Sequence, residues 1–330
     1  MFLLEILMNK KWKILNTYSE AHLRESMICL RDMAQLDTIA LDAKKLSQIL
    51  PLYDAYFSTL KIKLSKKLVE NCPNLKVIAT PSTGTDHLPM PYIKQRGIKV
   101  ISLRQSPELL KKITSTAELT WALLLSLVRR IPASSASVKA GGWRRSDFIG
   151  HQLSGKTLGI IGYGRLGQIV ANYGLAFGMQ VIAYDSDPSI KFERRVIKIG
   201  LSELLEQSDV ISLHIHLDKH NIGFLNADKM DKMKNDAIII NSSRGAIIDE
   251  SALLERLAAG RLGGAAVDVI DGEWGNINNH PMVEYARKHD NLLITPHIGG
   301  VSYEAQQLAV KYTAMQLNKF IKESVLEYAY

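Results

Sequence analysis

Short apolar runs alternate along this chain with longer segments in which apolar residues recur at helical spacing. This alternation is typical of parallel sheets, because each parallel strand needs a crossover segment before the next one. Before residue 110 the apolar runs predict strands at 12–16, 38–41, 55–58, 75–79 and 99–102. After residue 155 a second series predicts strands at 157–162, 180–184, 209–214, 237–241, 264–269 and 292–295.

The segment that joins the two series has a different pattern. The apolar residues of 114–131 lie on nearly all sides of a helix, which predicts a long buried helix, and Pro132 is expected to end it. A loop rich in Ser, Gly and Arg is expected to follow as far as residue 152, and a last helix is predicted over 303–321. Two such series in 330 residues predict an α/β protein with two domains.

Composition narrows the classes of partner. The net charge is +8, but the basic residues are scattered and do not interleave with aromatic residues, which argues against nucleic-acid binding. No apolar run approaches the roughly 18 residues of a membrane span. Cys29 and Cys72 form neither a CxxC pair nor a metal set, so we expect reduced thiols, no metal and a cytoplasmic protein. The apolar run at residues 1–8 is too short for a secretion signal, is interrupted by Glu5 and has no cationic segment before it, and Met8 is a candidate for the true start.

A glycine-rich turn follows the first strand of the second series. The apolar run 158–161 leads directly into Gly162-Tyr163-Gly164-Arg165-Leu166-Gly167, and a segment of helical composition follows. In this context Gly162 permits a tight turn, Gly164 lets the backbone approach a pyrophosphate, and Gly167 lets the helix pack on the strand. The next predicted strand ends at Asp185, whose carboxylate can accept both ribose hydroxyls and would repel a 2′-phosphate. The pattern therefore predicts a dinucleotide site that prefers NAD to NADP.

Three further polar residues each follow a predicted strand of this domain. Arg244 offers paired donors that match a carboxylate. His297 can protonate a developing alkoxide and take the proton back in the reverse direction. Glu273 can hold the other ring nitrogen of a histidine and so fix its tautomer. Ligands of parallel sheets bind at the carboxyl ends of strands, so these residues are candidates for catalysis of hydride transfer.

These motifs resemble those of the D-isomer-specific 2-hydroxyacid dehydrogenases. The resemblance covers about residues 75–321 and is carried by segments 155–167, 208–214, 240–245, 266–269 and 295–300. It implies that residues 1–110 and 300–330 form a flavodoxin-like substrate-binding domain, into which a Rossmann-like NAD-binding domain, 111–299, is inserted. It also implies a homodimer joined through the cofactor domain, with the helix from Thr114 and the loop to Gln152 at the interface.

The same resemblance assigns roles to individual residues. It makes Arg244, Glu273 and His297 the catalytic set, and it gives Ser82, Thr83 and Gly84 to a loop whose N–H groups hold the substrate carboxylate together with Arg244. Further contacts with the cofactor are implied for Arg165, Leu166, His214, Ser242, Asp268, Gly299 and Gly300.

The chain also departs from the family pattern. Ser82 replaces a common glycine, His87 a common asparagine, and His216 and Trp274 common prolines, and the stretch between Glu273 and His297 is longer than usual. The identity of the 2-hydroxy or 2-keto acid therefore stays open. Two further readings also stay open: an NAD-sensing binding protein or corepressor, and a phosphite dehydrogenase. Glu273 argues against a formate dehydrogenase, where the resemblance implies glutamine.

Overall fold

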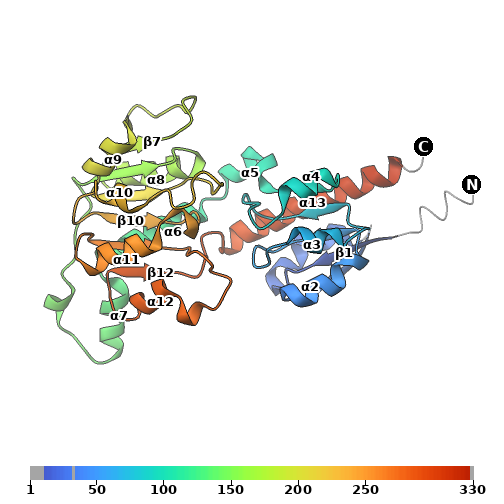
Figure 1. Ribbon diagram of the computed structural model, residues 1–330, viewed down its shortest axis with the longest axis horizontal. Coiled ribbons are helices and arrows are strands. Elements are labelled where there is room, and N and C mark those ends of the chain that lie inside the picture. Colours follow the sequence, from blue (N-terminus) through green and yellow to red (C-terminus); the bar gives the residue numbers. More distant parts are fainter. Residues whose placement is uncertain (1–10, 32–33, 328–330) are drawn as a thin grey trace, which may run out of the picture. The chain divides into compact units, whose positions relative to one another are not determined.

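The computed structural model describes residues 11–31 and 34–327, so the proposed start at Met8 lies outside the described residues. The chain divides into two compact units (Figure 1). One unit contains the N-terminal part up to Ile113 together with the C-terminal part from Val301, and the other is Thr114–Gly300.

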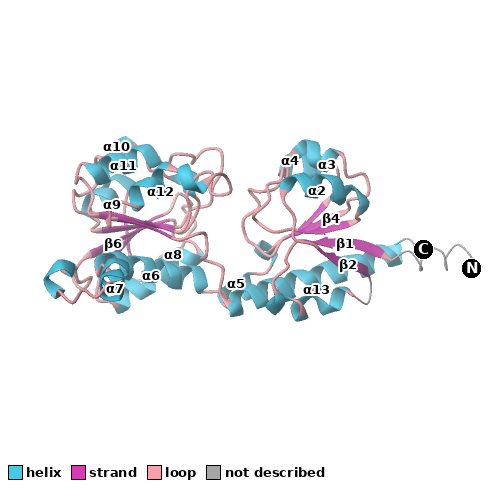
Figure 2. Ribbon diagram, turned by 90° about the horizontal axis from the view of Figure 1, so that it is seen from below, coloured by secondary structure: helices cyan, strands magenta, loops and turns pink. Residues whose placement is uncertain are grey.

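The first unit is built on a parallel five-stranded sheet in the order β2-β1-β3-β4-β5. Its strands are β1 (Trp12–Asn16), β2 (Ala34–Thr38), β3 (Ala55–Phe57), β4 (Val77–Ala79) and β5 (Lys99–Ile101). One face carries α2 (Ala43–Ile49), α3 (Lys66–Glu70) and α4 (Met90–Gln95), and α13 (Tyr303–Glu327) covers the other (Figure 2). The C-terminal helix thus completes the core of the N-terminal sheet, through Val310, Ala314, Leu317 and Ile321.

The second unit is built on a parallel seven-stranded sheet in the order β12-β11-β10-β9-β6-β7-β8. Its strands are β6 (Thr157–Ile161), β7 (Gln180–Tyr184), β8 (Ile197–Lys198), β9 (Val210–Leu213), β10 (Ile238–Asn241), β11 (Gly264–Val267) and β12 (Leu292–Ile294). One face is covered by α6 (Ser115–Val128) and α8 (Arg165–Ala176), and the other by α9 (Leu201–Gln207), α10 (Ala227–Met230), α11 (Glu250–Ala258) and α12 (Pro281–Ala286) (Figure 2). This is the doubly wound α/β architecture that the strand pattern predicts.

Short helices complete the described chain. They are α5 (Pro107–Lys111), α7 (Ile131–Lys139) and the 3₁₀ segments Ala21–Leu23, Glu25–Leu30, Leu50–Leu52, Leu103–Gln105, Arg145–Phe148, Gly245–Ile247 and Ile277–Asn279. Within the described residues, no helix is both long and apolar enough to cross a membrane.

Three local predictions were wrong. The second strand lies at Ala34–Thr38 rather than 38–41, because an edge strand half exposed to solvent carries little apolar signal. The segment 132–152 is not a loop throughout: Arg130, with a φ of 54°, separates α6 from α7, and Pro132 lies in the first turn of α7, where its missing N–H costs nothing. Helix α6 is buried on one side only, since Glu118 and Ala122 are exposed.

Candidate active site

The glycine turn between β6 and α8 has the geometry of a dinucleotide cradle. Gly162 has a φ of +93°, and a Cβ there would lie 2.6 Å from the carbonyl oxygen of His214. A Cβ on Gly167 would lie 2.1 Å from the carbonyl oxygen of Gly162, so helix and turn are in direct backbone contact. Gly164, the N-cap of α8, instead faces open space, with nothing within 4 Å of an added Cβ. The turn therefore presents bare backbone and a helix N-terminus to a ligand, which fits a pyrophosphate.

The carboxylate of Asp185 is fixed beside this turn. Its Oδ2 accepts a hydrogen bond of 2.7 Å from the N–H of Tyr163, and its Oδ1 accepts one of 2.9 Å from the N–H of Asp187. Asp185 directly follows β7, the strand next to β6, and is half-buried. The free lone pairs of such a carboxylate suit ribose hydroxyls and oppose a 2′-phosphate.

His214 follows β9 directly and lies against the same turn. Its Nε2 is 2.8 Å from the Oγ of Ser212, a buried side chain. Burial lowers the pKa of His214 to about 4, so this ring is neutral at physiological pH. It is therefore unsuited to donate a proton in catalysis.

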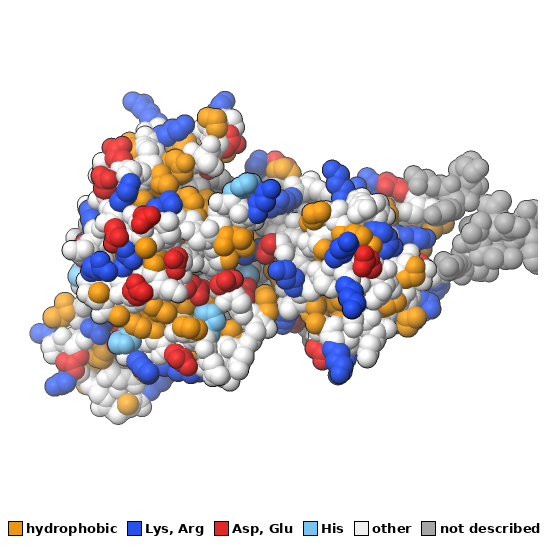
Figure 3. All heavy atoms as spheres, viewed as in Figure 1, with side chains coloured by type: hydrophobic (Ala, Val, Ile, Leu, Met, Phe, Trp, Pro, Cys, Tyr) orange, Lys and Arg blue, Asp and Glu red, His pale blue; other side chains and the backbone are white. Residues whose placement is uncertain are grey.

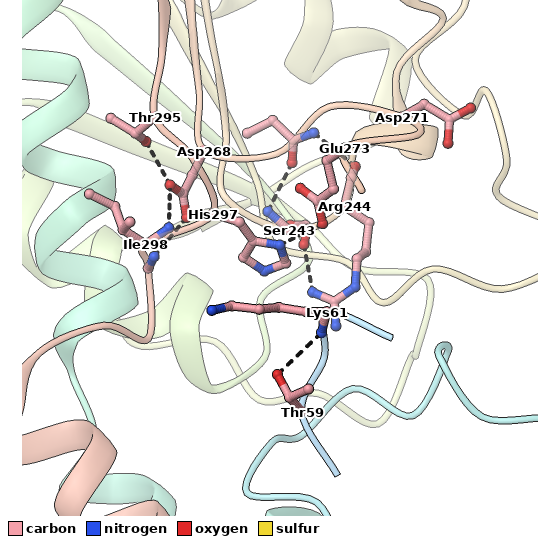
Figure 4. Close-up of polar contacts among 12 residues, drawn as sticks. Thr59, Lys61, Ser243, Arg244, Asp268, Asp271, Glu273, Thr295, His297 and Ile298 are labelled. Atoms are coloured by element: carbon pink, nitrogen blue, oxygen red, sulfur yellow. Dashed lines mark hydrogen bonds and ion pairs between the residues drawn. The ribbon is translucent and has the colours of Figure 1, made fainter. Parts of the chain in front are cut away.

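Arg244 is presented by a turn that follows β10. The buried Asn241 holds this turn from inside: its Nδ2 donates to the carbonyl of Arg244 at 2.9 Å, and its Oδ1 accepts from the N–H of Ser243 at 2.9 Å. Ser243 in turn donates to the carbonyl of Leu213 at 2.6 Å. The hydroxyl of Ser242 lies 2.8 Å from that of Thr120 on α6, so the turn is anchored on both sides. These contacts fix the backbone from which the guanidinium extends (Figure 4).

Glu273 and His297 form the central pair of the site. The Nδ1 of His297 lies 2.6 Å from the Oε1 of Glu273, and both side chains are less than one-fifth exposed (Figure 4). The half-exposed indole of Trp274 stacks on the imidazole, with ring centroids 5.9 Å apart. A cavity of about 440 Å³ borders the pair and is lined mainly by aliphatic side chains of the neighbouring β12 and α12, among them Val283 and Ile294. Apolar surroundings strengthen the attraction between a carboxylate and a protonated ring.

His297 has an unusual backbone, and Asp268 supports it. The φ of His297 is 55°, in the left-handed region that non-glycine residues rarely adopt. The buried carboxylate of Asp268 accepts hydrogen bonds from the Thr295 hydroxyl at 2.6 Å and from the N–H groups of Ile298 and Gly299 at 2.8 and 2.7 Å. Burial raises the pKa of Asp268, and these hydrogen bonds partly oppose the increase. The contact with the cofactor that the resemblance implies for Asp268 stays a prediction, because its oxygens hold the turn that carries His297.

The structure brings Arg244, Glu273, His297 and Asp268 together at the carboxyl ends of β10, β11 and β12, which are neighbours in one sheet. The sequence did not single out Asn241, although a polar residue closing an apolar strand is a signal that could have found it. Nor did it predict that Trp274 would stack on His297. No group of three or more His, Cys, Asp or Glu side chains in the described part of the chain is placed to hold a metal ion.

The predicted substrate loop belongs to the other unit and follows β4. Ser82 donates from its hydroxyl to the carbonyl of Gly84 at 2.7 Å, and Arg104 donates to the carbonyl of Thr83 at 2.7 Å. These contacts use carbonyl groups of the loop. Among the described residues, the N–H groups of Ser82, Thr83 and Gly84 donate to no protein acceptor. The loop thus keeps N–H donors for an anion, and its proposed role stays a prediction.

Comparison with known proteins places this chain in a family. Residues 121–299 match the family model "D-isomer specific 2-hydroxyacid dehydrogenase, NAD binding domain". The chain is 36% identical over 282 residues to a glyoxylate reductase of Thermococcus litoralis, covering 82% of each protein. It is 36% identical over 270 residues to a hydroxypyruvate reductase of Thermotoga maritima, covering 81% of this chain and 84% of that protein.

A solved structure extends the likeness to the whole fold. The D-lactate dehydrogenase of Aquifex aeolicus, in complex with NAD and lactic acid, superposes with a TM-score of 0.83 and 30% sequence identity, covering 96% of both chains. The glycine turn and the carboxylate of Asp185 fit the same cofactor. The chain therefore belongs to the D-isomer-specific 2-hydroxyacid dehydrogenases, and its cofactor is NAD.

Proposed function

We propose that this protein interconverts a small D-2-hydroxy acid and its 2-keto acid, with His297 as general acid and base, Glu273 as its partner, and Arg244 binding the substrate. The observation that carries the proposal is the 2.6 Å contact between Nδ1 of His297 and Oε1 of Glu273. Because this contact engages Nδ1, the proton of the reaction is assigned to Nε2. The glycine turn with Asp185 is the proposed cofactor site.

The residues divide the chemistry among them. When bound, NADH supplies the hydride, and NAD accepts it in the reverse direction. The guanidinium of Arg244 holds the substrate carboxylate and polarises the neighbouring carbonyl. His297 delivers a proton from Nε2 to the carbonyl oxygen, and Glu273 stabilises the protonated ring before this transfer. An acid–base contribution of this kind is worth about 100- to 10,000-fold in rate.

The substrate class follows from the relatives and the predicted loop. The relatives named above are a glyoxylate reductase and a hydroxypyruvate reductase, so we propose a 2-keto acid of two or three carbons. In this proposal the unit from Thr114 to Gly300 binds NAD, and the N–H groups of Ser82, Thr83 and Gly84 bind the substrate carboxylate.

We also propose a homodimer joined through the cofactor unit. The segment that follows α6 carries large apolar side chains exposed to solvent, namely Ile131, Val138, Trp143 and Ile149. Exposed apolar groups concentrated on one segment are typical of an interface between subunits. Sedimentation of the wild type and of Trp143→Ala tests this: the variant should shift toward monomer, and a monomeric wild type would refute the proposal. A cytoplasmic location stays a prediction.

The test of function is oxidation of NADH with a panel of 2-keto acids that includes glyoxylate, hydroxypyruvate and pyruvate. We expect turnover of at least one small member, and loss of that turnover in His297→Ala. If NADH binds tightly and no keto acid reacts, the proposal is wrong and a sensing role gains support. NADH formed from NAD and phosphite alone would instead support a phosphite dehydrogenase.

A further inference from the structure

The peptide group of Asp271 is held from two directions by side chains outside the catalytic set. The Oε1 of Glu250, in the first turn of α11, accepts a hydrogen bond of 2.7 Å from the N–H of Asp271. His280, the N-cap of α12, has its Nε2 2.8 Å from the carbonyl oxygen of Asp271. Its Nδ1 accepts from the N–H of Met282 at 3.3 Å, so the carbonyl partner assigns the proton to Nε2.

Gly245 makes a third contact with the same stretch of backbone. A Cβ added to Gly245 would lie 2.0 Å from the carbonyl carbon of Ile270 and 2.2 Å from the nitrogen of Asp271. The peptide bond between Ile270 and Asp271 therefore packs directly on Gly245, which is buried and follows Arg244 in the chain. Only glycine permits so close an approach.

The peptide group of Asp271 lies next to the backbone of two proposed catalytic residues, Glu273 and Arg244. In the chain, Gly272, with a φ of +71°, connects Asp271 to Glu273. Gly245, which packs on the Asp271 peptide, is bonded to Arg244. The Oε2 of Glu250 lies 3.7 Å from the Nε2 of His280, and each side chain is less than one-fifth exposed. Burial raises the pKa of Glu250, while the N–H of Asp271 and the nearby His280 oppose that increase.

We propose that Glu250 and His280 are positioning residues that clamp the Asp271 peptide, and thereby set where Glu273 meets His297 relative to Arg244. The inference rests on the proposed function, since it adds positioning residues to that reaction. Loss of the hydrogen bond that joins either Glu250 or His280 to Asp271 lets the Asp271–Gly272 turn shift, and this shift lengthens the 2.6 Å contact between Glu273 and His297. A displacement of about 1 Å in such a site costs on the order of 100-fold in rate.

The test compares Glu250→Ala and His280→Ala with two matched variants. Glu250→Gln keeps an oxygen that can accept from Asp271, so it should retain most of the activity. Asp249→Ala removes the N-cap of α11, whose carboxylate bonds Ala252 and not Asp271, and so controls for simple loosening of that helix. We expect kcat to fall about 10- to 100-fold in the two clamp variants, with KM for NADH unchanged and the two matched variants close to wild type.

Two readouts separate positioning from general loss of stability. In the clamp variants the pH dependence of keto acid reduction should differ from that of the wild type, whereas a general loss of stability would leave that dependence unchanged. The proton shared by His297 and Glu273 should also give a downfield NMR resonance in the wild type, which Glu273→Gln identifies by removing it, and the resonance should vanish in both alanine variants.

The outcomes distinguish this inference from the proposed function. The resonance is measured without substrate, so it decides the clamp even if no keto acid reacts. A wild-type resonance in folded Glu250→Ala or His280→Ala would overturn the inference while the dehydrogenase proposal stands. Should Glu250→Ala fail to fold, His280→Ala decides the question alone. If Asp249→Ala loses as much kcat as Glu250→Ala, the loss in Glu250→Ala comes from loosening of α11 and the inference is wrong.

Discussion

The glycine turn offers a sharp test, because its three glycines meet different surroundings. Gly164 has a φ of −75° and a ψ of −161°, which any residue can adopt, and an added Cβ would meet nothing within 4 Å. Gly167 is tightly enclosed, since its Cβ would lie 2.1 Å from a backbone oxygen. Gly164→Ala should therefore act on the ligand, and Gly167→Ala on the fold.

The magnitudes follow from these contacts. At an N-cap, alanine is less favourable than glycine by up to about 1 kcal/mol, and a smaller loss of chain entropy on folding offsets about 0.5 kcal/mol of this. The unfolding temperature of Gly164→Ala should thus stay within roughly 3 °C of the wild type. Gly167→Ala should lose about 3 kcal/mol or more, which corresponds to roughly 6 to 12 °C. If Gly164 faces the pyrophosphate, its variant should bind NADH at least about 10-fold more weakly, or about 1.4 kcal/mol.

Fluorescence titration with NADH and thermal unfolding without cofactor measure the two effects separately. Weak binding by a stable Gly164→Ala protein is the expected pattern. A Gly164→Ala variant that binds NADH as tightly as the wild type would refute the assignment of this turn to the pyrophosphate. A Gly167→Ala variant of normal stability would refute the claim that its contact is structural.

Three other predictions concern single side chains. His297→Ala should lower the rate of 2-keto acid reduction by at least about 100-fold while NADH still binds; unchanged turnover in a stopped-flow assay would remove His297 from the mechanism. Asp185→Ala should weaken NADH binding and reduce the ratio of the NADPH Kd to the NADH Kd. If parallel titrations give the same ratio as in the wild type, Asp185 is not the ribose ligand. The third prediction concerns His214, whose pKa is about 4 in the folded protein and 6.5 ordinarily. Keeping this ring neutral contributes to the free energy of unfolding in full above pH 6.5, and that contribution is lost as the pH falls from 6.5 toward 4. At pH 5 the loss is about 2 kcal/mol of the free energy of unfolding. Urea unfolding at pH 7.5 and at pH 5 measures this loss, and His214→Gln should remove it from the difference between the two values. The control His220→Gln, at an exposed histidine, should leave that difference unchanged.

Much of the fold could be predicted from the chain because buried parallel strands are short, continuously apolar runs. β6, β9 and β10 are of this kind, with nearly all their residues buried, and they fall within the predicted ranges. β2 and β8 lie at sheet edges, where neither burial nor pattern is strong, and these were misplaced or missed. Pro132 was misread because proline ends a helix in one position and begins one in another, and only the left-handed Arg130 before it distinguishes the two cases.

The candidate site shows a similar division. Glycine at 162, 164 and 167, and polar residues after apolar strands at 244 and 297, are local signals, so the chain alone determined the cofactor motif and the chemical types available for catalysis. Tertiary structure decided which of them meet. Three contacts of the site join residues that are 9 to 31 positions apart in the chain. They are the 2.6 Å contact between Glu273 and His297, the hydrogen bonds of Asp268 to the turn after His297, and the hydrogen bonds of Glu250 and His280 to Asp271. Such distances depend on the packing of several strands and turns at once, and no local pattern encodes them.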